Sequence, residues 1–494
     1  MRRRDFLAST AAALGAFALP ERLVADPYAP LVGLARAPRP VRVRGRVTGA
    51  GRPLANVKVS DGLQIVRTGA DGRYVLVTDA ANPFVFVSTP AGWQPARTPM
   101  GIARFFAPIT GAAEQEASFD LAPRPGDARH TVLVLADPQT QYRAETELLH
   151  AETVPDVVRT VQGLGDRAVV GVACGDIMFD DLSLYPEWER AVQRMGVPFH
   201  QVIGNHDLDF AARTNEGASA TFRSRFGPTH YAFDLGAVHY VVLDNVFWHG
   251  AGYLGYIDQR QLEWLAADLA TVERGATVVV LLHIPPLSTW DMRATGAKSP
   301  ASGNSTMNRQ ALYRLLEPYR AYLVSGHQHE LEHVREGGAT HVVSGAVCGA
   351  WWSGPICYDG TPNGYLVLDG DDAAVRWRYQ ATGLPAEHQL RVYGRGADPS
   401  AADEVVANVW AWDPTWTVRW FEDGAPRGLA SRRVGRDPLS VQLHAGPALP
   451  VRRPWVEPAP TGHLFYVRPS PQAREVVIEA TDGAGRTYRE RVGV

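Results

Sequence analysis

The sequence predicts an α/β domain between two smaller β domains. Between residues 128 and 372, continuous apolar runs such as TVLVLA and ATVVVLL alternate with helical patterns, as expected for a sheet buried on both faces. In residues 38–125 and 384–494, short segments instead alternate polar and apolar side chains between turn residues. A chain of 494 residues also exceeds what one hydrophobic core usually serves. We therefore expect three domains with these boundaries.

Residues 1–25 are typical of a signal peptide. They combine a basic start, an apolar stretch too short to span a bilayer, and small residues near Ala25. Arg3 and Arg4 resemble the twin-arginine signal, whose pathway carries folded proteins; a general secretory signal is the alternative. We therefore expect export by the twin-arginine machinery to the periplasm or the exterior. No later apolar run is long enough to be a transmembrane helix.

The two flanking segments carry strand patterns and no catalytic cluster. VRVRGRV, NVKVSDG, RYVLVT and FVFVST follow one another at the spacing of a β-sandwich. Near the C-terminus, QLRVY, VVANVWAW, TVRWFEDG, LFYVRP and VVIEAT predict a second, mainly-β domain. The chemistry is therefore expected in the central segment.

Predicted strands of the central segment end at side chains that bind metals. The pairs are Asp137 after 131–136, Asp176 after 167–173, Asn205 after 199–203, His283 after 276–282, and His327 with His329 after 321–325. Helical patterns lie between them near 145–163, 259–272 and 308–317. We expect the strand ends to converge at the carboxyl edge of one sheet. Imidazole, carboxylate and amide oxygen suit borderline divalent metals such as zinc, iron or manganese.

The motifs, taken together and in order, resemble the calcineurin-like metallophosphoesterase family over residues 130–370. They are Asp137, Gly175-Asp176, Gly204-Asn205-His206-Asp207, His283 and Gly326-His327-Gln328-His329. The resemblance implies an α/β sandwich of two mixed sheets flanked by helices. The flanking domains resemble the N-terminal sandwich and the C-terminal domain of exported members of this family.

The resemblance also implies a binuclear centre with assigned ligands. One divalent metal ion would be held by Asp137, Gln139, Asp176 and His329, and the other by Asp176, Asn205, His283 and His327. A hydroxide between the metals would attack phosphorus, while His206 protonates or stabilises the leaving oxygen. Two cations would neutralise phosphoryl charge and lower the pKa of bound water. By its position beside His206, Asp207 could hold the imidazole in orientation, or it could be a solvated loop residue.

One position departs from the family pattern. The family usually has Asp-x-His at the first motif, where this chain reads Asp137-Pro138-Gln139. Gln139 offers only a neutral amide oxygen, so the first site could bind loosely or prefer a harder ion such as manganese. Gln139 could instead act as a hydrogen-bond donor beside the metal. The identity of the metals (manganese, iron or zinc) stays open.

We therefore predict an exported metal-dependent phosphoesterase acting on a small-molecule or cell-envelope phosphate ester, with a diester slightly favoured. A formal charge of -3, evenly spread, gives no argument for a specific nucleic-acid partner or a membrane surface. A cell-envelope binding protein with a degenerate metal centre is the alternative, supported only by Gln139. A metal-dependent hydrolase of non-phosphate substrates is a third reading.

Two further features leave alternatives open. Trp248, Trp290, Trp351 and Trp352 follow predicted strands and could form walls for an apolar or sugar-bearing group, or could pack the domains together. The three cysteines are an odd number, so a disulfide framework is not expected, although a Cys348–Cys357 bridge is possible.

Overall fold

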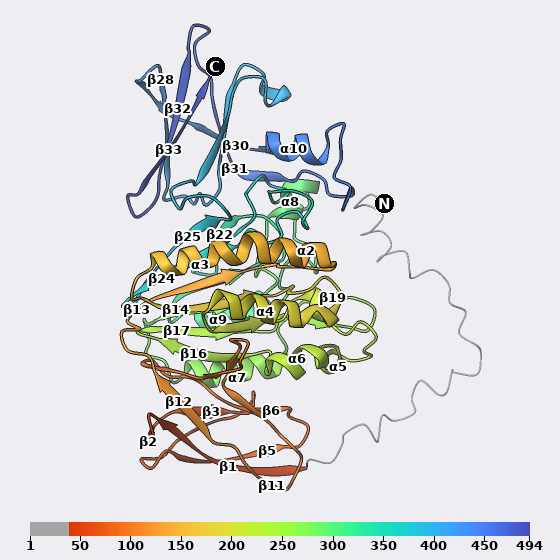
Figure 1. The fold of residues 1–494 in the computed structure, drawn as a ribbon, viewed down its shortest axis with the longest axis vertical. Coiled ribbons are helices and arrows are strands. Elements are labelled where there is room, and N and C mark those ends of the chain that lie inside the picture. Colours follow the sequence, from red (N-terminus) through yellow and green to blue (C-terminus); the bar gives the residue numbers. More distant parts are fainter. Residues whose placement is uncertain (1–38) are drawn as a thin grey trace, which may run out of the picture.

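The computed structural model describes residues 39–494. The predicted signal peptide at 1–25 and its Arg3-Arg4 pair lie outside the described residues. Three parts are stacked along the longest axis, with the central domain between an N-terminal and a C-terminal β domain (Figure 1). Among the helices of residues 39–494, none has both the length and the apolar character needed to cross a membrane.

The N-terminal domain consists of two main sheets and a short ribbon. Strand β5 alternates exposed and buried side chains along its length, so Tyr74 and Leu76 face the interior. The first sheet contains β1 (Pro40–Gly49), β2 (Arg52–Pro53), β5 (Arg73–Asp79), β7 (Trp93–Gln94), β11 (Glu114–Glu116) and β12 (Phe119–Pro123). The second contains β3 (Lys58–Ser60), β4 (Ile65–Arg67), β6 (Phe84–Val87) and β10 (Phe106–Pro108), and the ribbon β8 (Ala96–Arg97) and β9 (Ala103–Arg104).

The central domain contains two mixed sheets, as the family resemblance implied. The first has the order β15 (Phe199–Val202), β14 (Ala168–Cys174), β13 (Arg129–Leu135), β24 (Gly364–Asp371) and β25 (Ala374–Ala381). The second has the order β16 (Tyr231–Leu235), β17 (Val238–Val242), β20 (Thr277–Leu281), β21 (Arg320–Ser325), β23 (Ala339–Val343) and β22 (Glu332–Glu336). A small ribbon pairs β18 (Val246–Trp248) with β19 (Tyr253–Gly255). In each sheet the strands that precede the motifs run parallel to one another.

The strands that carry the motifs are divided between these two sheets, so the expectation of a single sheet edge was wrong. Strands β13, β14 and β15 belong to the first sheet, whereas β20 and β21 belong to the second. Alternate residues such as Val132 and Val172 of the first sheet share one apolar core with Val278 and Val280 of the second. The sheets therefore pack face to face, and the motifs meet where their strand ends adjoin.

Helices cover the outer faces of both sheets. The three expected helical regions are present as α2 (Arg143–Leu148) continued through the π-helical turn η2 (Leu149–Thr153) into α3 (Val154–Gly163), and as α7 (Gln259–Leu269) and α9 (Arg309–Leu316). Helix α4 (Tyr185–Met195) was not predicted, although it buries one face on the first sheet. The remaining helices are α5 (Asn215–Ala218), α6 (Ala220–Phe226) and α8 (Trp290–Thr295), with 3-10 turns η3 (Leu182–Leu184) and η4 (Asn205–Asp207).

The C-terminal domain is two four-stranded sheets with one short helix. One sheet has the order β26 (Leu390–Tyr393), β27 (Val405–Val409), β31 (Pro460–Val467) and β30 (Ser431–Arg436). The other has the order β29 (Ala425–Leu429), β28 (Thr417–Glu422), β32 (Glu475–Thr481) and β33 (Thr487–Gly493). Helix α10 (Pro438–His444) and the 3-10 turn η5 (Pro399–Ala401) complete it.

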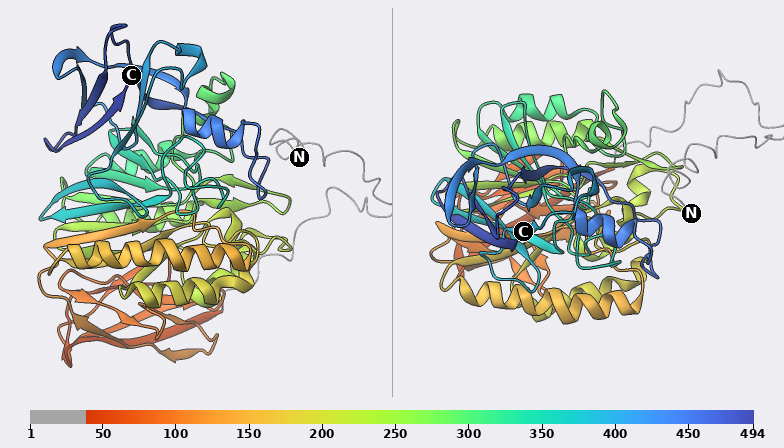
Figure 2. Two further views of the ribbon diagram at one scale, coloured as in Figure 1. Left: turned by 45° about the horizontal axis from the view of Figure 1, so that its top comes forward. Right: turned by 90° about the horizontal axis from the view of Figure 1, so that it is seen from above.

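Both β domains are joined to the central domain by buried polar contacts. On the N-terminal side, Lys58 Nζ lies 2.6 Å from Asp268 Oδ1, and both side chains are almost fully buried. On the C-terminal side, the His463 ring lies 3.1 Å from Asp359 Oδ2, also in the interior. The left view of Figure 2 shows the three parts adjoining one another in order.

Candidate metal centre

Four of the predicted ligands meet at the junction of the two sheets. His283 Nε2 lies 3.2 Å from Asp176 Oδ1, 3.1 Å from Asn205 Oδ1 and 3.2 Å from His327 Nδ1. The ligand atoms of Asp176, His283 and His327 all lie within 4.8 Å of one another. This is the set of side chains that the sequence predicted for the second metal.

The first predicted set lies beside it. His329 Nε2 is 3.6 Å from Asp137 Oδ1, and Asp137 Oδ2 accepts a hydrogen bond from the His327 backbone N–H at 2.9 Å. Gln139 Nε2 donates to Asp176 Oδ2 at 2.7 Å. The chain therefore places the other six predicted ligands around Asp176, the predicted bridge, and this placement fits two adjacent cations.

Each imidazole has one nitrogen turned toward the centre and the other fixed by a backbone carbonyl. His283 Nδ1 lies 3.0 Å from the Cys174 carbonyl oxygen, and His329 Nδ1 lies 2.6 Å from that of Gly349. His327 uses its other nitrogen, with Nε2 2.8 Å from the Gly303 carbonyl oxygen. Such carbonyl contacts select the tautomer that leaves the opposite nitrogen free to bind a metal.

One buried atom supports the fit of the centre to a cation. His329 Nε2 is buried and has no hydrogen-bond partner within residues 39–494. Buried polar atoms are nearly always satisfied, and this one faces the Asp137 carboxylate at the centre. The described side chains therefore fit a metal ion, which would accept the lone pair of this nitrogen.

The backbone is strained at five of the predicted ligands. Asp137, Gln139, Asp176, His327 and His329 have φ between 39° and 73°, a region that residues with a Cβ rarely adopt. Such strain gathers at functional sites, where surrounding structure over-determines it. The strand ends therefore turn sharply, and the turns direct these side chains to one point.

Two motif glycines allow the loops to approach the ligands closely. A Cβ at Gly204 would lie 2.0 Å from the Asp176 backbone nitrogen, and one at Gly326 would lie 2.4 Å from Asp137 Oδ2. No other residue fits either position without moving a ligand. The glycines of the two motifs are therefore explained by space.

Burial and neighbouring charges shift the pKa values of the ligand side chains at the centre. Burial, opposed by the positive charge of His283, raises the pKa of the Asp137 carboxyl to about 8. Burial also raises the pKa of Asp176, but His283 and His206 outweigh it and hold that pKa below its usual range. Burial lowers the pKa of His327 and of His329 to about 3, so both imidazoles are neutral, as metal ligands must be. Burial lowers the pKa of His283 as well, but Asp176 outweighs it and raises that pKa to about 9, so a metal ion would displace the proton of His283 on binding.

His206 lies at the edge of the centre with its ring held on two sides. Its Nδ1 is 2.6 Å from Asp180 Oδ1, and its ring stacks on Phe179 with the centroids 4.3 Å apart. Burial lowers the pKa of His206, but Asp176 and Asp180 outweigh it and raise the pKa above its usual value. His206 can therefore carry a proton on Nε2, the nitrogen that Asp180 does not use.

The predicted role of Asp207 requires a correction. Asp180, which the sequence analysis did not select, makes the contact with the His206 imidazole. Asp207 instead accepts hydrogen bonds from backbone N–H groups of Gly204 and Ile177 and from the Tyr185 hydroxyl. Because η4 turns sharply after Asn205, the Asp207 side chain points into the protein, where it holds two motif loops together.

Gln139 acts as a hydrogen-bond donor in this structure, which is one of the alternatives that the sequence left open. Its amide nitrogen donates to the predicted bridging carboxylate of Asp176, whereas its carbonyl oxygen faces the Cys348 thiol at 3.9 Å. In this arrangement Gln139 orients Asp176. The three cysteines are free and buried in the described chain, so the Cys348–Cys357 bridge is not formed.

A cavity of about 290 Å³ opens onto the centre. Asn205 and His206 line it, and so do five aromatic side chains from outside the motifs, namely Phe179, Tyr253, Trp351, Tyr358 and Trp455. Of the four tryptophans considered in the sequence analysis, Trp351 lines the cavity wall. The other three, Trp248, Trp290 and Trp352, are at most 7% exposed and pack in the interior.

Arg453 and Trp455 of the C-terminal domain also line the cavity, and nothing in the sequence motifs could have identified them.

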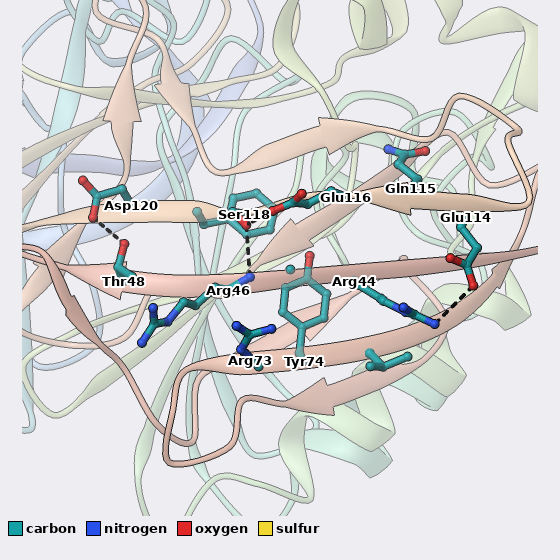
Figure 3. A pocket seen from close by; sticks show the side chains of 13 residues that line it. Arg44, Arg46, Thr48, Arg73, Tyr74, Glu114, Gln115, Glu116, Ser118 and Asp120 are labelled. Carbon is teal, nitrogen blue, oxygen red and sulfur yellow. Dashed lines mark hydrogen bonds and ion pairs between the residues drawn. The ribbon is translucent and has the colours of Figure 1, made fainter.

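A second, larger hollow lies on the N-terminal domain. It has a volume of about 700 Å³ and is lined by side chains of β1, β5, β11 and β12. Its polar groups pair with one another, as Figure 3 shows for Arg44 with Glu114 and for Thr48 with Asp120. It therefore lacks the converging, unpaired groups of the metal centre.

The fold and the site define a hydrolase of the binuclear-metal class. Family models match the chain in three successive parts: the N terminal of calcineurin-like phosphoesterase over 41–124, calcineurin-like phosphoesterase over 130–331, and the C terminal of calcineurin-like phosphoesterase over 341–488. The chain belongs to the calcineurin-like phosphoesterase family, with both extension domains. It is accordingly a metal-dependent phosphoric ester hydrolase, and its family uses a dinuclear metal centre.

Solved structures share parts of this fold at low identity. A dimetal phosphatase from Danio rerio is 17% identical over 51% of this chain and 96% of its own, with a TM-score of 0.36. A purple acid phosphatase from yellow lupin (Lupinus luteus) seeds is 12% identical over 66% of this chain and 67% of its own, also at 0.36. GAP50 of Plasmodium is 14% identical over 51% and 84%, at 0.35. A search of curated proteins finds no significant match.

Proposed function

We propose that this protein hydrolyses an organic phosphate ester, with a diester preferred over a monoester. The observation that carries the proposal is the convergence of Asp176, Asn205, His283 and His327 beside the unpartnered buried nitrogen of His329. When bound, two divalent cations would neutralise charge on the phosphoryl oxygens and supply an activated water. Asp137, Asp176 and His329 would hold one ion, and Asp176, Asn205, His283 and His327 the other.

His206 is the group that serves the leaving oxygen. Its Nδ1 is engaged by Asp180, so Nε2 is the atom available to a substrate in the cavity. Nε2 donates a proton to the departing alkoxide, and Asp180 stabilises the ring in its charged form before the transfer. Phe179 stacks on the ring and limits its rotation.

The preference for a diester rests on charge. A monoester carries up to two negative charges near neutral pH, whereas a diester carries one. Among the described residues that line the cavity, Arg453 is the one arginine, no lysine is present, and its guanidinium is already paired with Glu145. Apart from the metals, the cavity thus offers little charge for a dianion.

The alternative of a binding protein with a degenerate centre has no support beyond Gln139. Gln139 contacts Asp176, and every other predicted ligand lies at the centre.

The test is the hydrolysis of bis-p-nitrophenyl phosphate and of p-nitrophenyl phosphate by protein supplied with manganese. We expect turnover of both, faster with the diester, and loss of both activities in Asp176→Asn. Faster turnover of the monoester would contradict the diester preference. Absence of turnover with metal bound would contradict the phosphoesterase proposal itself.

Export and location are a separate proposal. The residues that support it, Arg3 and Arg4 within 1–25, favour passage through the twin-arginine machinery and action in the periplasm or outside on a small-molecule or cell-envelope ester. Replacing both arginines by lysine should retain the protein in the cytoplasm on cell fractionation. Unchanged export of that variant would favour the general secretory alternative.

A further inference from the structure

A loop of the C-terminal domain forms part of the wall of the metal-centre cavity. This loop joins α10 to β31 and contributes Arg453 and Trp455 to the lining, whereas the other lining residues come from the central domain. Arg453 has φ 55°, an uncommon value for a residue with a long side chain. The loop is therefore held in a specific, strained conformation at the mouth of the site.

Arg453 anchors this loop to the central domain. Its guanidinium donates to Gln141 Oε1 at 3.0 Å and to Glu145 Oε1 at 3.1 Å, and its side chain is only 8% exposed. The guanidinium carbon also lies 4.7 Å from the centroid of the Phe179 ring, which stacks on His206. Only the Phe179 ring thus lies between this residue of the C-terminal domain and His206, the predicted leaving-group acid.

The aromatic rings form a continuous wall that starts at a metal ligand. Trp351 stacks on His329, with centroids 4.1 Å apart and planes at 19°. Trp455 lies 4.9 Å from Trp351 with its plane tilted by 57°. Both tryptophans are half-buried and line the cavity, so part of their apolar surface faces the space beside the metals. A ligand that covers this surface would gain stacking and hydrophobic free energy.

Several polar side chains near this wall are paired within the protein. Asn304 Nδ2 donates to Asp291, and Gln328 Nε2 donates to the Asn304 carbonyl oxygen. Arg453 donates to Gln141 and Glu145, and its Nε is buried. The wall therefore presents mainly ring surface, and a planar group would stack on it over a whole face.

We propose that Trp351 and Trp455 form a binding site for a planar aromatic group of the substrate, so that the C-terminal domain selects aryl or nucleobase-bearing phosphate esters. This inference rests on the proposed function, because the phosphate of the same molecule would occupy the metal centre. Arg453 positions the loop through its contacts with Gln141 and Glu145.

The test compares the binding of phenylphosphonate and methylphosphonate to the manganese-loaded full chain by isothermal titration calorimetry. Neither compound is an ester, so the measurement is independent of turnover. We expect phenylphosphonate to bind roughly tenfold more tightly, in keeping with the contribution of one aromatic stacking contact. Trp455→Ala should remove most of this preference and change the affinity for methylphosphonate less than about twofold.

Two further variants separate stacking from folding. Trp455→Phe keeps a ring and should retain part of the preference for phenylphosphonate. Trp412→Ala is the matched control, because Trp412 lies in the same domain but packs near Phe465 and Arg432, away from the cavity. It should bind both phosphonates as the unaltered protein does.

Equal affinity for the two phosphonates, or an equal loss of both in Trp455→Ala, would overturn the inference. Such a result would leave the proposed function intact if bis-p-nitrophenyl phosphate is still hydrolysed. Conversely, selective phenylphosphonate binding without any ester hydrolysis would contradict the proposed function and support the aromatic site.

Discussion

The hollow on the N-terminal domain and the cavity at the metal centre differ in volume and in how their polar groups are held. The hollow on the N-terminal domain measures about 700 Å³ and the cavity at the metal centre about 290 Å³. In the larger one, the side chains of Arg44 and Glu114 pair with each other and are 56% and 63% exposed. In the smaller one, the lining side chains of Asp176 and His329 belong to residues that are only 1% exposed. Volume therefore does not identify the chemistry here.

The difference lies in what the surrounding protein does to the polar groups. Exposed ion pairs are screened by water and contribute little to stability or binding. At the metal centre, burial shifts pKa values, the backbone is held at positive φ, and His329 Nε2 has no partner in the described chain. Burying polar groups and straining the backbone both cost free energy, and a bound cation or substrate would offset that cost.

The largest effect is expected from His329→Ala. This change removes a ligand to one metal, so the content of bound metal should fall by about one equivalent per chain. Loss of several kcal/mol of charge stabilisation predicts a decrease in kcat/KM of about a thousandfold. Metal analysis and hydrolysis of bis-p-nitrophenyl phosphate check this, with His249→Ala, an exposed histidine outside the centre, as control. Unchanged metal content would contradict the ligand assignment.

A smaller effect, selective for the leaving group, is expected from His206→Gln. Loss of a general acid should lower kcat by roughly 10²–10⁴-fold for an alkyl phosphate ester. The loss should be much smaller for p-nitrophenyl esters, because p-nitrophenolate leaves without protonation. Rates for a series of leaving groups check this prediction.

Asp180→Asn should show the same selectivity as His206→Gln with a loss of roughly 10–100-fold. Asp207→Asn is the contrasting variant, since Asp207 contacts backbone N–H groups and Tyr185, whereas Asp180 is the carboxylate that contacts the imidazole. It should lower the melting temperature without changing the dependence on the leaving group. The opposite pattern would restore the role first predicted for Asp207.

A pH-dependent effect on stability is expected from His239→Gln, far from either hollow. His239 lies between Asp234 and Asp268, and Asp268 also binds Lys58 of the N-terminal domain. Burial lowers the pKa of His239, but Asp268 outweighs it and raises that pKa from 6.5 to about 9. The stabilisation is therefore complete below pH 6.5 and is lost as pH rises through about 9.

His239→Gln should thus lower the free energy of unfolding by on the order of 1–3 kcal/mol at pH 6 and by less at pH 10. Denaturant unfolding at the two pH values measures this difference. An equal loss at both would mean that His239 is neutral in the folded protein.

The smallest effect is expected in the larger hollow. Arg44→Gln removes the exposed pair with Glu114 and should change the free energy of unfolding by less than about 0.5 kcal/mol. Its kcat/KM for bis-p-nitrophenyl phosphate should stay within about twofold of the unaltered protein. A large loss of activity would show that the two hollows are coupled and would remove the distinction drawn between them.

The sequence was most informative where short motifs follow buried strands. Asp137, Asp176 and His283 each come directly after a continuous apolar run, and such a run predicts the strand and its end. The helices α3, α7 and α9 were also predictable, because their apolar side chains recur at helical spacing. Helix α4 was missed, although its buried residues repeat at helical spacing.

The sequence was least informative about contacts between segments distant along the chain. Nothing in the local pattern separates Asp180 from Asp207 as the partner of His206, because both lie in polar turns. The division of the motif strands between two sheets was equally hidden, since periodicity reports burial and not the neighbouring strand.

By itself, then, the sequence determined the family and the presence of β domains on both sides. It also determined the order along the chain of the strands that end at predicted metal ligands. Motif order and apolar periodicity are local properties, and they can be read without coordinates. Only the tertiary structure decided that Gln139 donates to Asp176, that Asp180 holds His206, and that Arg453 and Trp455 line the cavity. These contacts join residues up to 312 positions apart, and packing alone brings them together.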